Sequence, residues 1–557
     1  MRPLPLAPSC STASRLALRS AGLASALATA AALLVAASPA ATAADTTTGL
    51  GVDYVHKSGD LAVGSGKVFV TNGEKLVAAG TDGELLGEVG GLTDASGLAT
   101  AQDGAHLYVA LTESGKVAEI DTATLQITRS IDLAAYPCPT HLARSGDQLW
   151  VGYGCESGDG GVVGLDLSAA TPQPTAVTSD FSGAPLVAAG GGTLVVGETH
   201  TSTSSLFVYD VSSTPALRGE IDGFTHDIEG LADVAVTADG ADVLAVSSPS
   251  RRTYRWDADS LEKTRTYAGA TASEGFPTSV ATSPDGAHVA VGGADGSDVV
   301  LYDAATGETV HGLDGTIADR TNEVAFSGTD AFAVVTASSG ELYLWRMEDI
   351  TFPASKLTLT SASDAVVNQP LTLAGTLEVP SGASPGAQPL TVTHRLPGGT
   401  TETLDSVTTA PDGSFTLTDT PAAGGAHTYT VLWNGDDDAR WSTTSVTLTV
   451  KNISSLTATG PEEWLVGVPV TISGVLLPKP PASGWGYPLT VKRTLTNANG
   501  TVTIALPGVG ARKDGTYSFT HTPTEAGLYT YTVEWAGNAG YTSAKADHEV
   551  QVKEWEE

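Results

Sequence analysis

The feature that most constrains this chain of 557 residues is a repeat between about Leu50 and Arg346. Each copy holds a short apolar strand, a tight turn with glycine, a second apolar strand, and a third strand that usually ends in aspartate. The clearest copy, SVATSPDGAHVAVGGADGSDVVLYD, runs from Ser279 to Asp303. Short apolar runs bounded by Gly and Asp predict β-strands, and a fixed period predicts one structural unit per copy.

Glycine and aspartate mark equivalent places in these copies. The first turn of each copy falls at Gly66, Gly104, Gly146, Gly192, Gly240, Gly286 and Gly328. The third strand ends at Asp121, Asp166, Asp210, Asp257 and Asp303, and we expect these side chains to cap backbone groups. Four strands in about 40–45 residues are typical of a β-propeller blade, so the copies predict seven blades.

The last copy stops after three strands, at Arg346. We therefore expect Leu50–Lys57 to supply the missing outer strand, because closing the ring removes exposed strand edges. The S-P-D-G turns and the Y-D or W-D strand ends resemble those of the WD-repeat and YVTN-repeat propeller superfamily. That resemblance implies a propeller fold and does not imply a particular activity.

After Pro353 the pattern changes to alternating strands rich in Thr and Val, in two copies. QPLTVTHRL, from Gln388, matches YPLTVKRTL, from Tyr487, and Y-x-V-x-W-x-G begins at both Tyr429 and Tyr531. About seven short strands in a hundred residues predict a β-sandwich, with these Tyr and Trp residues in the core. The copies resemble bacterial immunoglobulin-like domains of exported proteins, although they lack the cysteine pair of the antibody type.

The predicted fold is therefore all-β, a seven-bladed β-propeller followed by two tandem immunoglobulin-like β-sandwiches. The expected parts are a signal peptide at 1–43, the propeller at 44–350, and sandwiches at 354–451 and 452–553.

The N-terminal segment predicts export. Arg2, Arg15 and Arg19 precede or flank an apolar run at 21–37, and Ala41-Thr42-Ala43 fits the small-residue rule for signal peptidase. We expect cleavage after about Ala43 and a secreted product, because no later stretch reaches the roughly 20 apolar residues that span a bilayer. The chain carries 62 acidic against 28 basic residues, which argues against nucleic acid as a partner.

Two cysteines remain after that cleavage, Cys138 and Cys155, and an even number in an exported protein predicts a disulfide. A hairpin folded about Gly146-Asp147 pairs residues whose numbers sum to 293, as 138 and 155 do. The two cysteines should then face each other across an antiparallel pair.

The loops of a propeller divide into two sets, one on each face. One set here is short and uniform, and the other is longer and varied, so we expect a protein, glycan or small ligand to bind at the varied-loop face. His141, His200, His226 and Glu229 fall on this face, and such residues could hold a divalent metal or transfer protons. The alternative is that an acidic exported protein simply carries His and Glu on its loops.

No G-x-S-x-G, H-E-x-x-H or P-loop sequence is present, so no catalytic residue and no organic cofactor are predicted. The first functional hypothesis is a secreted, non-enzymatic binding or adhesion protein with the sandwiches as spacers. The alternative is an extracellular propeller lyase or hydrolase with a metal-dependent His/Glu site at the channel mouth. Propeller lyases that open cyclic antibiotic lactones use such a mouth, but no motif of theirs matches here. A third hypothesis is carbohydrate binding by the sandwiches, through Trp441, Trp464 or Trp485.

Overall fold

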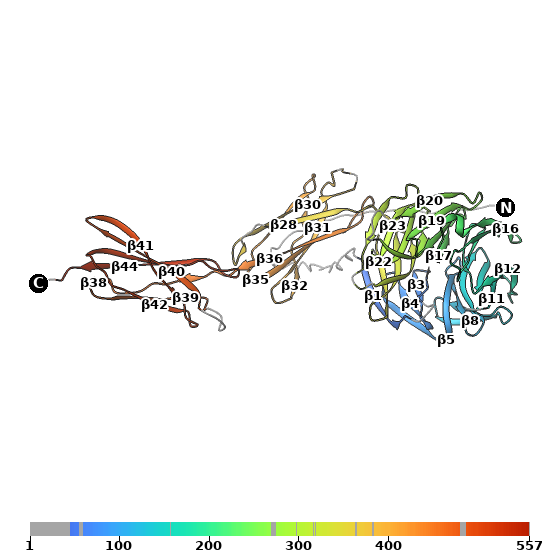
Figure 1. The fold of residues 1–557 in the computed structure, drawn as a ribbon, viewed down its shortest axis with the longest axis horizontal. Helices are drawn as coiled ribbons and strands as arrows, with labels where there is room; N and C mark the ends of the chain where they lie inside the picture. Colours follow the sequence, from blue (N-terminus) through green and yellow to red (C-terminus); the bar gives the residue numbers. More distant parts are fainter. Residues whose placement is uncertain are drawn as a thin grey trace, which may run out of the picture. The chain divides into compact units, whose positions relative to one another are not determined.

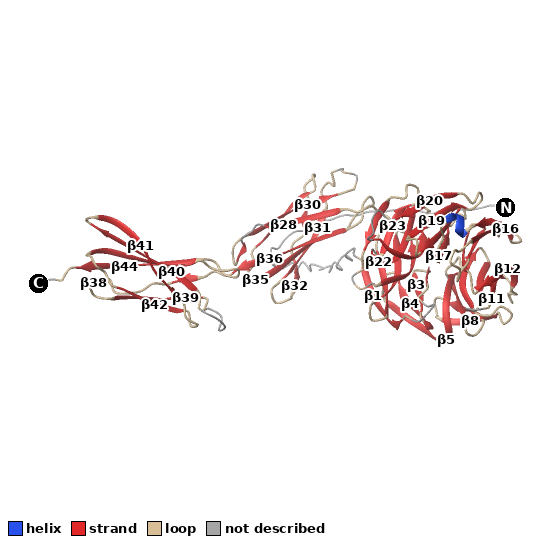
Figure 2. Ribbon diagram, viewed as in Figure 1, coloured by secondary structure: helices blue, strands red, loops and turns tan. Residues whose placement is uncertain are grey.

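The computed structural model describes residues 45–54, 59–155, 158–268, 274–296, 298–315, 317, 319–361, 365–380, 382, 384–479 and 486–555. The predicted signal peptide lies outside the described residues. Nearly all of the described secondary structure is β, and its one helix is the four-residue α1 (Gly223–His226) (Figure 2). No helix in these ranges is long and apolar enough to cross a membrane.

Strands β1 to β27 form antiparallel sheets in which strands adjacent in sequence are mostly paired (Figure 1). Their bounds are β1 Thr46–Asp53, β2 Leu61–Gly64, β3 Lys67–Thr71, β4 Gly73–Gly80, β5 Leu85–Thr100, β6 His106–Leu111, β7 Lys116–Asp121, β8 Gln126–Asp132, β9 Pro139–Ser145, β10 Gln148–Tyr153, β11 Asp159–Asp166, β12 Thr175–Ser182, β13 Leu186–Gly190, β14 Thr193–Gly197, β15 Leu206–Asp210, β16 Ala216–Ile221, β17 Leu231–Val236, β18 Asp242–Ser247, β19 Arg252–Asp257, β20 Lys263–Ala268, β21 Glu274–Thr282, β22 His288–Gly296, β23 Val299–Asp303, β24 Thr309–Leu313, β25 Arg320–Ser327, β26 Asp330–Thr336 and β27 Glu341–Met347.

Three of these sheets are separate four-stranded units, β9–β12, β13–β16 and β17–β20. The others are joined at their edges. β5 pairs with β4 through residues 85–90 and Ala95, and with β6 through residues 95–100, so one long strand belongs to two successive units. A single pair, Ala294↔Arg320, joins β22 to β25. The same four-stranded pattern therefore continues through the joined sheets.

The first strands of the units, β2, β5, β9, β13, β17, β21 and β25, lie beside one another in that order, and β25 lies beside β2. The core fills the spaces between adjacent sheets. One cluster joins Tyr108 of β6 to Val151 of β10, and another joins Phe332 of β26 to Val68 of β3. A closed ring of first strands with sheets packed face to face is a β-propeller.

β1 closes the ring, as predicted. It pairs antiparallel with β27, from Thr46↔Arg346 to Asp53↔Glu341, and forms the outer strand of the last unit. The strand begins at Thr46, four residues before the expected start at Leu50, because the ladder with β27 continues through Thr46 to Gly49. The expected end at Lys57 lies outside the described residues.

The turn predictions are also confirmed. Every glycine predicted at a first turn has a left-handed backbone, with φ between 59° and 92°. Glycine adopts this conformation without the steric cost of a Cβ atom. The strand-end aspartates cap the turns that follow them. Oδ1 of Asp303, for example, accepts hydrogen bonds from the backbone N–H groups of Ala305 and Thr306 and from the Thr306 hydroxyl.

The remaining strands form two β-sandwiches of the same design. The first has β28 Lys356–Ser361, β29 Ala365–Val366, β30 Leu371–Glu378, β31 Pro389–Arg395, β32 Thr401–Thr403, β33 Val407–Thr408, β34 Ser414–Asp419, β35 Gly425–Trp433 and β36 Ser442–Lys451. The second has β37 Ser455–Leu456, β38 Glu463–Leu465, β39 Val470–Leu477, β40 Pro488–Asn497, β41 Gly500–Gly510, β42 Thr516–His521, β43 Gly527–Trp535 and β44 Ala544–Lys553.

In each sandwich a three-stranded sheet faces a larger sheet. The order β28-β30-β34 in the first corresponds to β37-β39-β42 in the second, and β29-β36-β35-β31 corresponds to β38-β44-β43-β40. Tyr429, Trp433, Tyr531 and Trp535 are buried between the sheets, so their predicted place in the core is confirmed.

Candidate functional site: an acidic cavity on the propeller axis

A cavity of about 300 Å³ lies where the first strands of the propeller meet. Every first strand, or the residues just before it, contributes to its wall. Its wall includes Asp60, Ser96, Thr140, His141, Asp233, Arg320 and Glu323. Most of them lie toward the start of their strands, away from the glycine turns. The cavity is therefore on the side where the irregular loops enter the first strands.

Asp60 joins two neighbouring units at this cavity. Its Oδ1 accepts a hydrogen bond from the backbone N–H of Leu61 at 2.7 Å, and its Oδ2 accepts one from Leu98 at 2.6 Å. Leu61 begins β2, and Leu98 belongs to β5. The carboxylate thus bridges two neighbouring first strands that are not paired with each other.

Asp233 makes the same arrangement on another part of the ring. Its Oδ1 accepts from Val234 of β17 and its Oδ2 from Val280 of β21, both at 2.7 Å. Glu323 accepts a hydrogen bond from the backbone N–H of Val324 through Oε1, at 3.1 Å. Asp60 and Asp233 therefore have both carboxylate oxygens bonded to the scaffold, because neighbouring strands present backbone donors to them.

Burial changes the protonation of these three acids. Desolvation raises the pKa of Asp60 to about 6, although two backbone N–H groups act in the opposite direction. Desolvation, with a smaller contribution from the charge of Asp60, raises the pKa of Asp233 to about 7. The pKa of Glu323 is raised well above its usual value, first by desolvation and then by the charges of Asp233 and Asp60. The three acids therefore oppose one another's ionisation near neutral pH.

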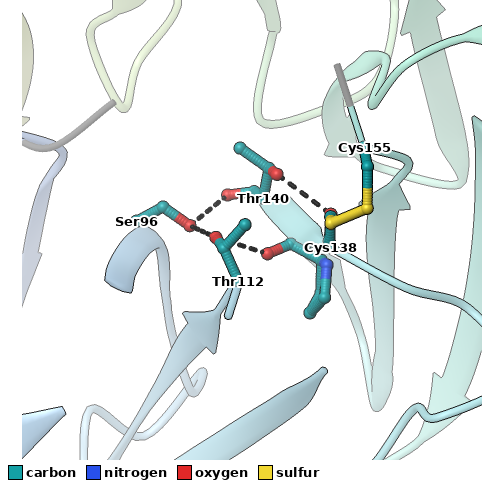
Figure 3. Close-up of a disulfide and its surroundings, with 6 residues drawn as sticks. Ser96, Thr112, Cys138, Thr140 and Cys155 are labelled. Atoms are coloured by element: carbon teal, nitrogen blue, oxygen red, sulfur yellow. Dashed lines mark hydrogen bonds between the residues drawn. A yellow bond between two sulfur atoms is a disulfide. The ribbon is translucent and has the colours of Figure 1, made fainter. Parts of the chain in front are cut away.

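Hydroxyl groups connect the cavity wall to the disulfide (Figure 3). The Ser96 hydroxyl donates to the carbonyl of Thr140 at 3.1 Å and is hydrogen-bonded to the Thr112 hydroxyl at 2.9 Å. The Thr140 hydroxyl donates to the carbonyl of Cys138 at 3.0 Å. Ser96 and Thr140 line the cavity, so this network joins β5 and β9 at its rim.

The Cys138–Cys155 disulfide is present, with its Cα atoms 5.2 Å apart. The β9–β10 ladder keeps the predicted register, in which residue numbers sum to 293, from Gln148↔Ser145 to Gly152↔His141. The register then shifts by one residue at Tyr153↔Pro139. The disulfide lies just beyond this irregularity and ties the loop before β9 to the loop after β10.

The structure does not bring the four predicted metal ligands into one group. His141 lines the axial cavity. His200 is exposed, with a left-handed backbone, and its ring lies beside Gly183. His226 lies in α1, where its ring meets Trp256 of β19 edge to face, and Glu229 is exposed. Across the described ranges, no three or more His, Cys, Asp or Glu residues are grouped so that they could hold a metal ion.

The sequence analysis did not single out Asp60 or Asp233. A signal for both was present, because each acid lies in or beside a short, otherwise apolar first strand, in GDLAVG and LADVAV. An acid in an inner strand of a propeller points either into the core or toward the axis, and only the axis offers it polar partners.

No protein-family model matches the chain, and no curated protein matches it in sequence. Solved structures with similar folds include hydrazine synthase of Kuenenia stuttgartiensis, at 16% identity and a TM-score of 0.43, over 53% of this chain and 97% of that chain. The β-propeller domain of Cps50 (Swd1) from Myceliophteria thermophila has 13% identity and a TM-score of 0.42, over 53% and 98%. Hsv2 of Kluyvelomyces marxianus has 11% identity and a TM-score of 0.39, over 52% and 98%. Similarity at this level says nothing of what this chain binds.

Proposed function

We propose that this protein is a secreted, non-enzymatic binding or adhesion protein. Its propeller binds a protein, glycan or small ligand at the varied-loop face, over the axial cavity, and its two sandwiches act as spacers. The observation that carries this proposal is the bonding of Asp60 and Asp233. Both oxygens of each carboxylate accept backbone hydrogen bonds, which suits fixed acceptors in a scaffold better than groups that must transfer protons.

The architecture in this proposal is a seven-bladed propeller of the WD-repeat type with two immunoglobulin-like sandwiches. Support for seven blades comes from the ring of first strands, β2, β5, β9, β13, β17, β21 and β25. Support for the immunoglobulin-like assignment comes from the shared strand order of the two sandwiches and their buried Tyr and Trp residues.

The lining of the cavity favours one kind of ligand group. Asp60, Asp233 and Glu323 and the hydroxyls of Ser96 and Thr140 place carboxyl and hydroxyl oxygens in its wall, beside the basic side chains of Arg320 and His141. A ligand that reaches the cavity should therefore present a cationic or donor-rich group. The formal net charge of −34 also favours approach of a cationic ligand.

The varied-loop face also carries an exposed aromatic side chain. Phe224 of α1 is 81% exposed and follows Gly223, whose backbone N–H donates to the Ser205 hydroxyl. α1 lies in the irregular connection between β16 and β17. Aromatic side chains are enriched in protein interfaces, so Phe224 is a suitable residue with which to test binding at this face.

The binding proposal is tested by capture from the surface fraction of the secreting cell, with the full mature chain as bait. We expect one ligand to be retained, and Phe224→Ala to reduce its retention at least about fivefold. Leu217→Ala is the matched control, because Leu217 is 54% exposed on the neighbouring β16 and should leave retention unchanged. Equal retention by the wild type and by Phe224→Ala would contradict binding through this loop.

Export is tested separately, by N-terminal sequencing of the protein recovered from the medium. We expect the mature chain to begin at Ala44. Recovery of an intact N-terminus from the cytoplasm alone would contradict secretion.

The alternative function is an extracellular lyase or hydrolase with a metal-dependent site. The observation in its favour is that His141 lines the same cavity as Asp60, Asp233 and Glu323. Elemental analysis of the purified mature protein distinguishes the two functions. One divalent ion per chain that is lost in His141→Ala would support the enzyme and overturn the non-enzymatic proposal.

A further inference from the structure

The second sandwich has a pocket with two tryptophan residues at its edge. The pocket has a volume of about 400 Å³ and is lined by Glu463, Trp464, Leu465, Val468, Lys553 and Trp555. Trp555 is 64% exposed, and Trp464 is partly buried. Trp464 packs with one side against the core of the sandwich, whereas the exposure of Trp555 beside the same pocket is not explained by packing within the sandwich.

The pairing of β38 with β44 brings the two tryptophans together. The strands are parallel, with Trp464 opposite Val552 and Leu465 opposite Lys553. Trp555 follows two residues after the end of β44, so it lies close to Trp464 although 91 positions separate them in the sequence.

Both indole rings are held by the protein itself. The indole N–H of Trp464 donates to the carbonyl of Val468, and that of Trp555 donates to the carbonyl of Val466, both at 3.0 Å. Because each N–H is bonded to the backbone, the rings are oriented without a ligand. The exposed ring of Trp555 and the part of Trp464 that lines the pocket remain for contact, and little conformational entropy is lost when a ligand stacks on them.

An ion pair supplies polar groups beside these rings. Nζ of Lys553 lies 2.6 Å from Oε2 of Glu463, and both side chains are at least half exposed. A ligand suited to this pocket has flat apolar faces and a perimeter of hydrogen-bonding groups. A pyranose ring has this character, because its C–H groups form the faces and its hydroxyls form the perimeter. A strongly anionic glycan is disfavoured by the acidic charge of the chain.

We propose that the second sandwich binds a neutral carbohydrate, with a pyranose ring stacked on Trp464 and Trp555 and hydroxyls bonded to Lys553 and Glu463. This site goes beyond the proposed function of the propeller, in which the sandwiches serve only as spacers. It also does not depend on the axial cavity, so either proposal can fail while the other stands.

The first sandwich provides an internal comparison. The parallel pair β29–β36 corresponds to β38–β44, and Ala365, opposite Val450, takes the place of Trp464. In the aligned sequences Ile453 takes the place of Trp555. The aromatic pair therefore belongs to the second copy alone. Of the other tryptophans considered for carbohydrate binding, Trp441 packs against the Arg440 guanidinium, and Trp485 lies outside the described residues.

The test uses the full mature chain on a printed array of neutral oligosaccharides, followed by titration of the strongest ligand against intrinsic tryptophan fluorescence. We expect binding by the wild type and a loss of about tenfold or more in affinity for Trp555→Ala, because the stacked ring is removed. Trp555→Phe should retain part of the affinity. Since Trp555 is largely exposed, its substitution should leave the thermal unfolding temperature nearly unchanged.

The matched control is Ile453→Ala, which removes the exposed side chain two residues after β36, as Trp555 lies two residues after β44. It should bind as the wild type does. Absence of binding across the neutral array, or undiminished binding by Trp555→Ala, would overturn the carbohydrate site. Capture of a ligand by the propeller is measured separately with Phe224→Ala, so the two failures are distinguishable.

Discussion

The propeller contains two groups of acids that belong to the same repeat, and their pKa values are shifted in opposite directions. The turn aspartates, Asp121, Asp210, Asp257 and Asp303, have lowered pKa values, chiefly because backbone N–H groups and hydroxyls of the following turn donate to them. The axial carboxylates, Asp60, Asp233 and Glu323, have raised pKa values, chiefly because of desolvation.

The difference does not come from the number of hydrogen bonds. Asp60 accepts two backbone N–H groups, as Asp303 does, yet the pKa shifts of the two acids have opposite signs. Both side chains are partly exposed, but Asp60 lies in the cavity where the first strands converge and is more strongly desolvated than Asp303 at its turn. At the propeller axis, the loss of solvation therefore raises the pKa of an acid more than two backbone hydrogen bonds lower it.

The largest expected effect is on the pH dependence of stability at the axis. The raised pKa of Asp233 contributes to the free energy of unfolding. This contribution is fully present below about pH 4 and is lost as pH rises through about 7. Asp233→Asn should remove this loss, on the order of 4 kcal/mol between pH 4 and 8, since one pKa unit corresponds to about 1.4 kcal/mol. Urea unfolding at several pH values measures the difference from wild type.

The same substitution at the turn is the control for that measurement. Asp303→Asn should leave the pH dependence between pH 4 and 8 like that of the wild type, because the lowered pKa of Asp303 acts only at more acidic pH. Parallel curves for wild type and Asp233→Asn would show that the axial acid is as well solvated as the turn acid.

A somewhat smaller effect is expected from the disulfide that ties the loop before β9 to the loop after β10. Its cysteines are 17 positions apart, and a loop of this length predicts a loss of about 3 kcal/mol on removing the bond. Cys138→Ser/Cys155→Ser should therefore unfold at lower urea concentration than the oxidised wild type. Reduced wild type should match the double variant, and equal stability of all three would contradict a stabilising role for the disulfide.

The smallest expected effect is at a turn. Asp303→Ala removes an acceptor for two backbone N–H groups and one hydroxyl, at a cost of about 1 kcal/mol at pH 7. Because the folded-state pKa of Asp303 is lowered, this difference should shrink as pH falls below about 4. Asp303→Asn keeps one acceptor oxygen and should lower the free energy of unfolding by less than Asp303→Ala does. A constant difference down to pH 2 would mean that the charge of Asp303 is not involved.

Much of the fold could be predicted from local patterns. The glycine turns, the capping aspartates and the β9–β10 hairpin that brings Cys138 near Cys155 each depend on residues close in sequence. Closure by the N-terminal strand was predicted because the last copy lacks a strand, but its start at Thr46 depends on the length of β27. The predicted metal ligands were chosen by loop face alone. Residues in loops on one face can lie against different sheets. His226, for example, packs against Trp256 of β19 and does not line the axial cavity.

The sequence by itself determined the repeat, the turns that end its first strands, and the duplication of the sandwiches, because these follow from short-range backbone preferences and strand periodicity. Only the tertiary structure decided that Asp60, Asp233 and Glu323 share one cavity, and that Trp464 and Trp555 share one pocket. Solvation and stacking depend on which distant strands meet. That meeting is set by closure of the ring and by the pairing of β38 with β44.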